Sequence, residues 1–416
     1  MPQDRRMTRR EFVRRGATAA AAVGAVGAPA VNVLGANEML NVGLIGPGIR
    51  GVHLMRQMKG IEGVRITAIA DIYDGWRARG VEMAKETAPE VKAYDHYKKI
   101  LEDRDLDALV IATPEHAHCR MLIDALEAGY DVYCEKPMVH TWKEGQAVVR
   151  ANQKAKRIVQ IGTQRRSTDI YHQAAQIVQS GGIGQVTQVR AFWYRNTTDD
   201  KPQWRYPIPE DASEDNINWD AFHMGARKHP FDIHRYFQWR CYWDYSMGIG
   251  GDLMVHQVDI INMVMGSKMP SAVTAMGKIL RFHELGRETP DTWNAILEYP
   301  EGFYVNYSSI FSNEHYGFGE QFLGQSGTIE IVSDNLMRIY PERHGMKQVE
   351  AQEIEAKVAK TKPHLENFFE CVRTREQPNC DEVQGYYAST AAYMSVLSHH
   401  KGKVVRWDEE KQKIVS

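Results

Sequence analysis

A glycine-rich turn between an apolar strand and a helix constrains the fold of this chain more than any other feature. Residues 40–45 predict a short strand that runs into Gly46-Pro47-Gly48-Ile49-Arg50-Gly51, a match to the pattern G-x-G-x-x-G. A helix over 52–58 follows, and a second strand over 64–70 ends at Asp71, twenty residues after the last glycine. This order of elements predicts a dinucleotide-binding βαβ unit.

The residue types in the turn suit the chemistry of a bound dinucleotide. Gly46 permits a tight turn, Gly48 lets backbone N–H groups approach a pyrophosphate, and Gly51 lets the helix pack close to the strand. The N-terminus of the helix then faces the phosphate charge. Two further residues of the turn, Ile49 and Arg50, are also expected to contact the cofactor.

Asp71 indicates which nicotinamide cofactor the domain prefers. A carboxylate at this position can accept hydrogen bonds from the adenosine ribose hydroxyls, and it repels a 2′-phosphate. The sequence therefore favours NAD, with NADP as the alternative, because Arg77 or Arg79 could soften the preference.

Strands and helices continue to alternate after this unit. Strands are predicted over 107–112, 130–134 and 158–162, with helices over 119–128 and 142–155. Such alternation predicts a parallel sheet with right-handed crossovers, whose ligands bind at the carboxyl ends of the strands. The residues expected at such ends, and near the cofactor, are Thr113, Pro114, His118, Glu135 and Lys136.

Length and composition limit the number of domains and the classes of partner. A chain of 416 residues suits two domains, here expected at 37–162 and 163–416. A formal net charge of -2 gives no basic excess for binding nucleic acid. The five scattered cysteines contain no CxxC pair and predict neither a disulfide framework nor a zinc site. No metal is expected, although His116 and His118, or Asp252, His256 and Asp259, could supply ligands.

The first 36 residues are expected to be a targeting segment. Thr8-Arg9-Arg10-Glu11-Phe12-Val13 is similar to a twin-arginine export signal, and a weakly apolar stretch from Gly16 to Ala30 follows it. This predicts export to the periplasm, with the cofactor loaded and tightly bound beforehand. A disordered or helical arm is the alternative. No later stretch is long and apolar enough to predict a membrane span in the mature protein.

These motifs resemble the Gfo/Idh/MocA family of oxidoreductases over roughly residues 40 to 408. The matching residues are the glycine turn, Ala112-Thr113-Pro114 with His118, Glu135-Lys136-Pro137, Gly250-Gly251-Asp252 with His256, and His364-Leu365-Glu366-Asn367-Phe368. The resemblance implies an α/β protein: a Rossmann domain followed by an α/β domain with a large, open, mostly antiparallel sheet. It also implies reversible oxidation of a sugar or cyclitol hydroxyl, with Lys136, Asp252 and His256 around the reacting group.

The same three residues suit this chemistry on physical grounds. Hydride leaves a carbinol carbon only if the hydroxyl proton leaves too, and His256 is a natural general base. Asp252 opens a helix predicted after a loop at 248–251, and its i, i+4 spacing places it on the same face as His256. Lys136 could stabilise the developing alkoxide. The alternative is a helix cap beside a partly buried histidine.

Aromatic and basic residues gather in the region expected to bind substrate. Five of the nine tryptophans lie between 193 and 243, and stacked aromatics suit the apolar faces of a sugar ring. Tyr194 or Trp239 is expected near the substrate, and Arg165 and Arg166 could reach it from the domain junction. Core packing by these aromatics is the alternative. The many arginines also permit an acidic or phosphorylated substrate.

The remainder of the chain predicts a strand-rich domain. Strands are expected over 273–279, 291–299, 303–311, 319–323 and 328–332, a flexible linker over 350–361, and helices over 365–373 and 382–398. A broad open sheet often buries its free face against another subunit, so a homodimer or homotetramer is expected.

Three functions compete. A dehydrogenase acting on a small carbohydrate comes first, and a glycosidase that works by transient oxidation, elimination and hydration comes second. A sensor without activity comes last, because Lys136, Asp252 and His256 are all present. The histidine at 256, where relatives resembling glucose–fructose oxidoreductase have a tyrosine, favours the inositol dehydrogenase-like pattern.

Overall fold

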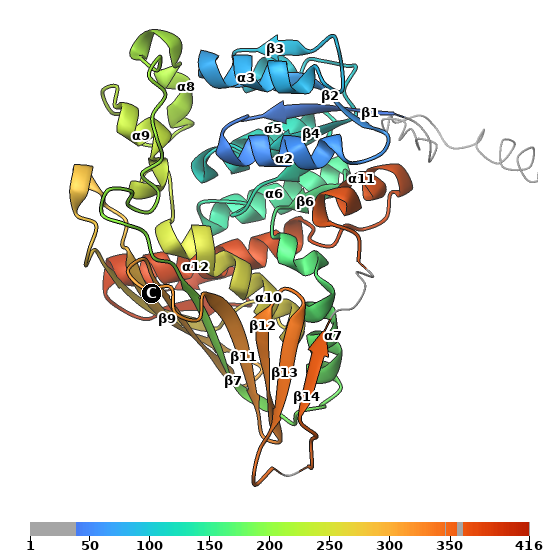
Figure 1. Ribbon diagram of the computed structural model, residues 1–416, viewed down its shortest axis with the longest axis vertical. Coiled ribbons are helices and arrows are strands. Elements are labelled where there is room, and N and C mark those ends of the chain that lie inside the picture. The colour runs from blue at the N-terminus through green and yellow to red at the C-terminus, as the bar shows by residue number, and fades with distance from the viewer. Residues whose placement is uncertain (1–38, 346, 356–360, 416) are drawn as a thin grey trace, which may run out of the picture. The chain divides into compact units, whose positions relative to one another are not determined.

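A six-stranded parallel sheet forms the N-terminal part of the protein in the computed structural model (Figure 1), which describes residues 39–345, 347–355 and 361–415. The strand order is β3-β2-β1-β4-β5-β6. The strands are β1 (Leu40–Ile45), β2 (Val64–Ala70), β3 (Lys92–Tyr94), β4 (Ala108–Ile111), β5 (Asp131–Cys134) and β6 (Val159–Ile161). This is the doubly wound order of a Rossmann fold.

Helices cover this sheet because its central strands are apolar along their whole length. All four residues of β4 and of β5 are buried, which is the pattern of parallel strands packed on both faces. The helices are α2 (Ile49–Lys59), α3 (Asp74–Ala84), α4 (Tyr97–Ile100), α5 (Glu115–Glu127) and α6 (Trp142–Ala155). Helix α2 begins three residues earlier than predicted, so that Gly51 lies in its first turn.

The second sheet has ten strands, in the order β14-β13-β12-β11-β7-β10-β9-β8-β15-β16. Every pairing in it is antiparallel except that of β7 with β10. Its strands are β7 (Val186–Tyr194), β8 (Ala272–Lys278), β9 (Thr292–Tyr299), β10 (Phe303–Ile310), β11 (Phe318–Gly324), β12 (Gly327–Ser333), β13 (Leu336–Pro341), β14 (Gln352–Glu355), β15 (Val405–Asp408) and β16 (Lys413–Val415). The predicted fold class, a Rossmann domain with a large and mostly antiparallel sheet, is confirmed.

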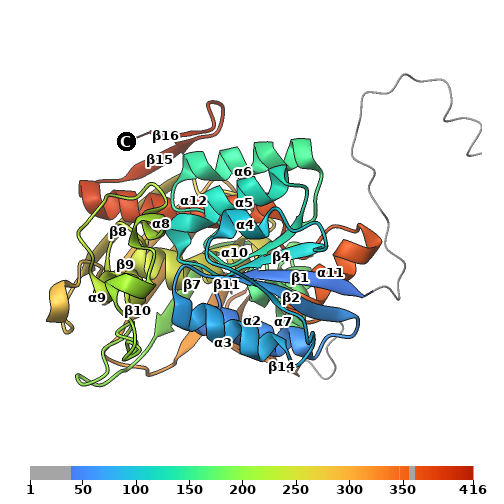
Figure 2. The same ribbon diagram turned by 90° about the horizontal axis from the view of Figure 1, so that it is seen from above.

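One face of the large sheet packs on helices, and the other face carries exposed apolar side chains. The long helices α10 (Val255–Met265) and α12 (Glu382–Lys401) contact each other, and α12 also contacts β8 and α6 (Figures 1 and 2). α7 (Asp169–Gln179) packs on α10, and α11 (His364–Thr374) on α2. Side chains alternate between buried and exposed along β9 and β10. No helix among the described residues is long and apolar enough to cross a membrane.

Two local predictions are wrong. Residues 352–355, expected in a flexible linker, form strand β14, because Met337 to Ile339 of β13 provide a free edge for pairing. The loop expected at 248–251 gives way to a π-helix over Gly250–Met254, which continues directly into α10. Asp252 therefore lies within this π-helical turn and is not the first residue of a helix. The predicted signal over 1–36 lies outside the described residues.

Short helices occupy the long connection from β7 to α10. They are α8 (Trp219–His223), α9 (Ile233–Phe237) and 3-10 turns over Glu214–Asn216 and Trp239–Cys241. A β-bridge between Tyr73 and Ile217 joins this connection to the segment that follows β2. The connection thereby comes to lie over the carboxyl ends of the Rossmann strands.

Candidate active site

A cavity of about 540 Å³ lies between the carboxyl ends of the Rossmann strands and the connection from β7 to α10. This volume is typical of a small-molecule site. Its lining includes both the glycine turn and the residues expected to carry the chemistry. The predicted site residues that line it are Gly46, Gly48, Ile49, Arg50, Asp71, Thr113, Pro114, Glu135, Lys136, Trp239, Asp252 and His256.

The glycine turn has no room for side chains. Gly46 has φ of +88°, a conformation that favours glycine, and a Cβ there would lie 2.9 Å from the carbonyl oxygen of Ala112. A Cβ on Gly51 would lie 2.1 Å from the carbonyl oxygen of Gly46. Gly51 does not line the cavity, and its part is to let α2 approach β1. The turn thus leaves backbone N–H groups open to a pyrophosphate at the start of α2.

Asp71 ends β2 at the wall of the cavity. One carboxylate oxygen accepts hydrogen bonds from the Tyr73 backbone N–H, at 2.8 Å, and from the Tyr236 hydroxyl, at 3.4 Å. Burial raises the pKa of Asp71 to about 7, against the opposing effect of these hydrogen bonds. Arg77 is held by Asp74 and by the Asp71 carbonyl, and Arg79 by the Pro47 carbonyl. Both arginines thus lie near Asp71 with their guanidinium groups already hydrogen-bonded.

Residues that follow β4 and β5 complete the cofactor end. Arg50 forms an ion pair with Glu135 at 2.7 Å, which joins the glycine turn to the end of β5. His118 was expected to contact the cofactor, but it lies outside the cavity lining. Its ring is buried and bridges the carbonyl oxygens of Pro137, at 2.7 Å, and Thr113, at 2.9 Å. His118 therefore positions the two segments that bear Thr113 and Lys136.

Asp252 is the centre of the polar network at the other end. Its Oδ1 accepts hydrogen bonds from Lys136 Nζ at 2.9 Å and from Arg240 Nε at 3.0 Å, and its Oδ2 accepts one from Trp204 Nε1 at 3.2 Å. Burial alone would raise the pKa of Asp252, but the charges of Lys136, Arg240 and Arg195 outweigh it and lower the pKa well below its ordinary value. The carboxylate is therefore ionised, and it holds Lys136 Nζ in the cavity.

His256 lies one turn beyond Asp252 and lines the same cavity. Burial, reinforced by the charges of Lys136 and Arg165, lowers the pKa of His256 well below 6.5. The ring is therefore neutral at pH 7 and has a free lone pair. Its Nδ1 is shielded from solvent and has no hydrogen-bond partner among the described residues, so contact with a substrate hydroxyl falls to the part of the ring that lines the cavity.

Two predicted substrate residues lie elsewhere. Tyr194 points to the open face of the large sheet, where its hydroxyl contacts Ser308 Oγ at 2.7 Å, because side chains alternate along β7. Its neighbour Trp193 faces the cavity instead. Arg165 is buried outside the lining, where it bonds to Glu320 at 3.3 Å and stacks 4.7 Å from the Trp193 ring. The alternation along β7 predicts that Trp193 and Tyr194 lie on opposite faces of the sheet, but it does not decide which of them meets the cavity.

Arg166 also lies outside the cavity, paired with Asp259 at 2.8 Å. Besides Arg50 at the cofactor end, the arginines that line it are Arg195, which directly follows β7, and Arg240, in the 3-10 turn over 239–241. The sequence indicated their region without distinguishing them from other arginines there. The aromatic residues of the lining that were not singled out are Trp76, Tyr97, Trp193, Tyr206, Phe222, Tyr236 and Phe237.

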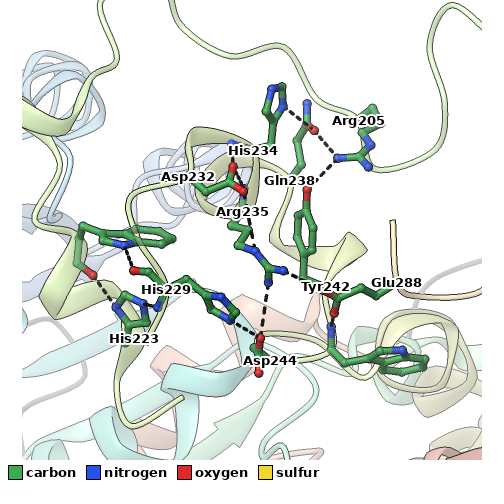
Figure 3. Close-up of polar contacts among 12 residues, drawn as sticks. Arg205, His223, His229, Asp232, His234, Arg235, Gln238, Tyr242, Asp244 and Glu288 are labelled. Atoms are coloured by element: carbon green, nitrogen blue, oxygen red, sulfur yellow. Dashed lines mark hydrogen bonds and ion pairs between the residues drawn. The ribbon is translucent and has the colours of Figure 1, made fainter. Parts of the chain in front are cut away.

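A polar network behind the cavity holds its aromatic wall in place (Figure 3). Arg205 donates to Gln238 Oε1 at 2.7 Å. Gln238 Nε2 in turn donates to the Tyr206 carbonyl at 3.0 Å. Arg235 bonds to Glu288 at 2.8 Å and so ties α9 to the segment before β9. Because Gln238 precedes Trp239, these contacts fix both Tyr206 and Trp239 as walls of the cavity.

Metal binding has no support in the described part of the chain. No group of three His, Cys, Asp or Glu side chains there is arranged to hold an ion. Asp252 and Asp259 are each paired with basic side chains instead. The cavity does fit a dinucleotide, since the glycine turn leaves space that a Cβ would fill and Asp71 stands at the position for the ribose. Fold and site together define a dinucleotide-binding oxidoreductase of the Rossmann class.

Comparison with known proteins identifies the family. The model for "Oxidoreductase family, NAD-binding Rossmann fold" matches residues 40–163, and that for "GFO/IDH/MocA C-terminal domain" matches residues 221–330. The two matches together cover more than half of the chain, which therefore belongs to the Gfo/Idh/MocA family and has an NAD-binding N-terminal domain.

Individual relatives are more distant. Inositol 2-dehydrogenase of Salmonella typhimurium is 35% identical over 170 residues, which is 40% of this chain and 49%, about half, of that relative. Inositol 2-dehydrogenase of Gluconacetobacter diazotrophicus is 25% identical over 88% of this chain and 95% of its own length. The structure of levoglucosan dehydrogenase with NADH and L-sorbose superposes with a TM-score of 0.68 at 18% identity, covering 89% of this chain and 99% of that one. This last likeness shows the fold.

Proposed function

We propose that the protein oxidises a hydroxyl group of a sugar or cyclitol, with NAD as the hydride acceptor. The observation that carries the proposal is that Lys136, Asp252 and His256 line the same cavity as the glycine turn and Asp71. NAD, when bound, supplies the carbon that accepts the hydride. The names of the relatives, inositol 2-dehydrogenase and levoglucosan dehydrogenase, support a hydroxylated ring as substrate.

Each of the three residues has a role that its surroundings support. His256 is neutral because its pKa is lowered, so it can accept the proton of the reacting hydroxyl. Lys136 donates a hydrogen bond to the same oxygen and stabilises the alkoxide that develops as the proton leaves. Asp252 holds Lys136 Nζ at 2.9 Å and so fixes the direction from which that hydrogen bond comes.

The direct test measures NADH formation by the full chain over a panel of sugars and cyclitols, in the wild type and in Lys136→Met and His256→Asn. We expect kcat to fall by at least a hundredfold in both variants. Lys154→Met, which removes an exposed lysine from the last turn of α6, is the matched control and should keep full activity. Full turnover by Lys136→Met would contradict the proposed mechanism.

Mass spectrometry of nucleotide released from protein purified without added cofactor tests whether NAD is tightly bound. Stoichiometric NAD supports a cofactor that stays on the enzyme. In that case the panel includes glycosides, because release of an aglycone without net NADH would identify the alternative activity, glycoside cleavage by transient oxidation, elimination and hydration.

Export and assembly are separate proposals. A twin-arginine signal over residues 1–36 is tested by fusing these residues to a reporter and replacing Arg9 and Arg10 with lysine, which should abolish export. A homodimer or homotetramer, formed through the open face of the large sheet, is supported by exposed apolar side chains on it, among them Met276, Ile296 and Tyr304. Sedimentation of the wild type against Ile296→Glu tests that assembly.

A further inference from the structure

The charge of the substrate end of the cavity is not balanced. Three cationic side chains line it, Lys136, Arg195 and Arg240, and the one carboxylate among them is Asp252. Three positive charges against one negative charge leave two formal positive charges. His256 does not add to them, because its pKa is lowered and the ring is neutral.

The other acidic side chains near the cavity do not neutralise the positive charge of its substrate end. Glu135 is paired with Arg50 at 2.7 Å, and Asp71 stands at the ribose position. Glu115 lies behind Gly251 and outside the lining, and burial raises the pKa of its carboxyl. Neither Asp71 nor Glu135 lies beside Arg195 in an ion pair, and no other described carboxylate pairs directly with it.

Arg195 is the cation at this end that forms no ion pair with a carboxylate of the described residues, although its charge acts on Asp252 from a greater distance. Its guanidinium stacks 5.3 Å from the centroid of the Trp193 ring, and that ring lies 5.6 Å from the His256 ring. Arg195 and the proposed general base thus lie beside the same indole ring. Its side chain is half-buried, where the attraction for an anion is screened less than at the surface.

From these observations we propose that the substrate is an anionic sugar, whose carboxylate or phosphate group binds Arg195 while Arg240 and Lys136 provide further positive potential. The inference rests on the proposed function only in placing the sugar at this end of the cavity. An arginine fork that pairs with a planar or tetrahedral anion provides both affinity and orientation. The anion would be fixed beside Trp193, with the reacting hydroxyl directed toward His256 and Lys136.

Isothermal titration of the NADH-loaded full chain with D-glucuronate, D-gluconate, glucose 6-phosphate and D-glucose tests the proposal. We expect at least one of the anionic sugars to bind about tenfold to a hundredfold more tightly than glucose, which one charge-assisted hydrogen-bonded pair can supply. Comparing the affinities for D-glucuronate and D-gluconate with that for glucose 6-phosphate shows whether the site prefers a carboxylate or a phosphate group. Arg195→Gln should remove that preference, and Arg195→Lys should retain most of it.

Arg65→Gln is the matched control, because it removes the same charge from the exposed side of β2, far from the lining. It should leave all affinities within about twofold. Glucose that binds as tightly as every anion, binding of no anionic sugar at 10 mM, or a preference unchanged in Arg195→Gln would overturn the proposal.

Turnover separates this proposal from the proposed function. Oxidation of glucose and glucuronate with equal kcat/KM leaves the dehydrogenase intact and overturns the anionic substrate. Selective binding of an anion that depends on Arg195, without oxidation of any compound by NAD, supports the anion site and counts against the dehydrogenase.

Discussion

Replacing Asp252 with asparagine should affect stability and catalysis together. The substitution keeps the shape of the side chain and removes its charge. Two charge-assisted hydrogen bonds, from Lys136 Nζ and Arg240 Nε, then become bonds to a neutral oxygen. The amide nitrogen cannot accept the hydrogen bond from Trp204 Nε1, so a buried indole N–H is left without an acceptor.

The free energy of unfolding should fall by about 3 to 5 kcal/mol. Each weakened charged bond costs about 1 kcal/mol, and the unsatisfied indole about 1 to 3 kcal/mol. The sum agrees with the usual cost of breaking a buried ion pair. Because the pKa of Asp252 is lowered, this stabilisation is present above the unfolded pKa of about 4 and disappears only in stronger acid.

Asp259→Asn is the matched control on the same helix. Asp259 is also buried and pairs with an arginine, Arg166, at 2.8 Å, but it does not line the cavity. Because Asp259→Asn leaves Arg166 buried without its carboxylate, this control also breaks a buried ion pair and should cost stability, but it does so outside the cavity.

Urea unfolding of apoprotein at pH 7.5 measures both costs, and kcat/KM on the best substrate measures the effect on catalysis. We expect Asp252→Asn to lose at least a hundredfold in kcat/KM and Asp259→Asn to stay within about threefold. Equal midpoints for Asp252→Asn and the wild type would refute the argument that an ionised carboxylate holds the two cations.

Three further results are expected. Gly51→Ala should abolish NAD binding in a titration, because its Cβ would meet the Gly46 carbonyl at 2.1 Å and force α2 away from β1. Since the pKa of Asp71 is raised to about 7, the preference for NAD over NADP should increase as pH rises through 7, and Asp71→Ser should reduce it. Burial lowers the pKa of His116 to about 3 and of His364 to about 4, so the unfolded chain binds more protons and the unfolding free energy should fall as pH drops below 6.5, by about 1.4 kcal/mol per unit for each histidine. Urea titrations from pH 7 to 4.5 that show no such loss would contradict the assignment of both rings as neutral.

The sequence predicted the cofactor end of the site better than the substrate end, for a physical reason. The glycine turn, Asp71 and the Glu135-Lys136 pair are each fixed by the local end of one strand, so spacing along the chain locates them. Tyr194 was predicted wrongly because only the pairing of β7 with β10 and β11 decides which of its faces meets the cavity. Arg165 faced the same difficulty, since its partner Glu320 lies on β11, far along the chain.

Other strands were also missed, both where the partners are distant along the chain, as for β7, and where a partner is adjacent, as for β13 and the β15–β16 pair. No glycine turn like the one that follows β1 marks the ends of these strands, which are β7, β13, β15 and β16. The strand β14 was missed because its polar sequence resembles a linker. What stabilises β14 is the edge of β13, which the sequence of 352–355 does not reveal. Similarly, periodicity placed Asp252 and His256 on one helical face but did not predict the π-helical turn that joins them.

The ion pair between Lys136 and Asp252 connects the chemistry of the site with the way the two sheets are joined. Lys136 follows β5 of the Rossmann sheet. Asp252 belongs to the π-helical turn that leads into α10, one of the helices of the part of the chain that contains the large sheet. The same carboxylate also binds Arg240, beside the aromatic wall. Any movement that separates the sheets would therefore break the contact that directs Lys136 at the reacting oxygen. On this geometry, the contact between the two sheets and the placement of Lys136 depend on the same carboxylate, that of Asp252.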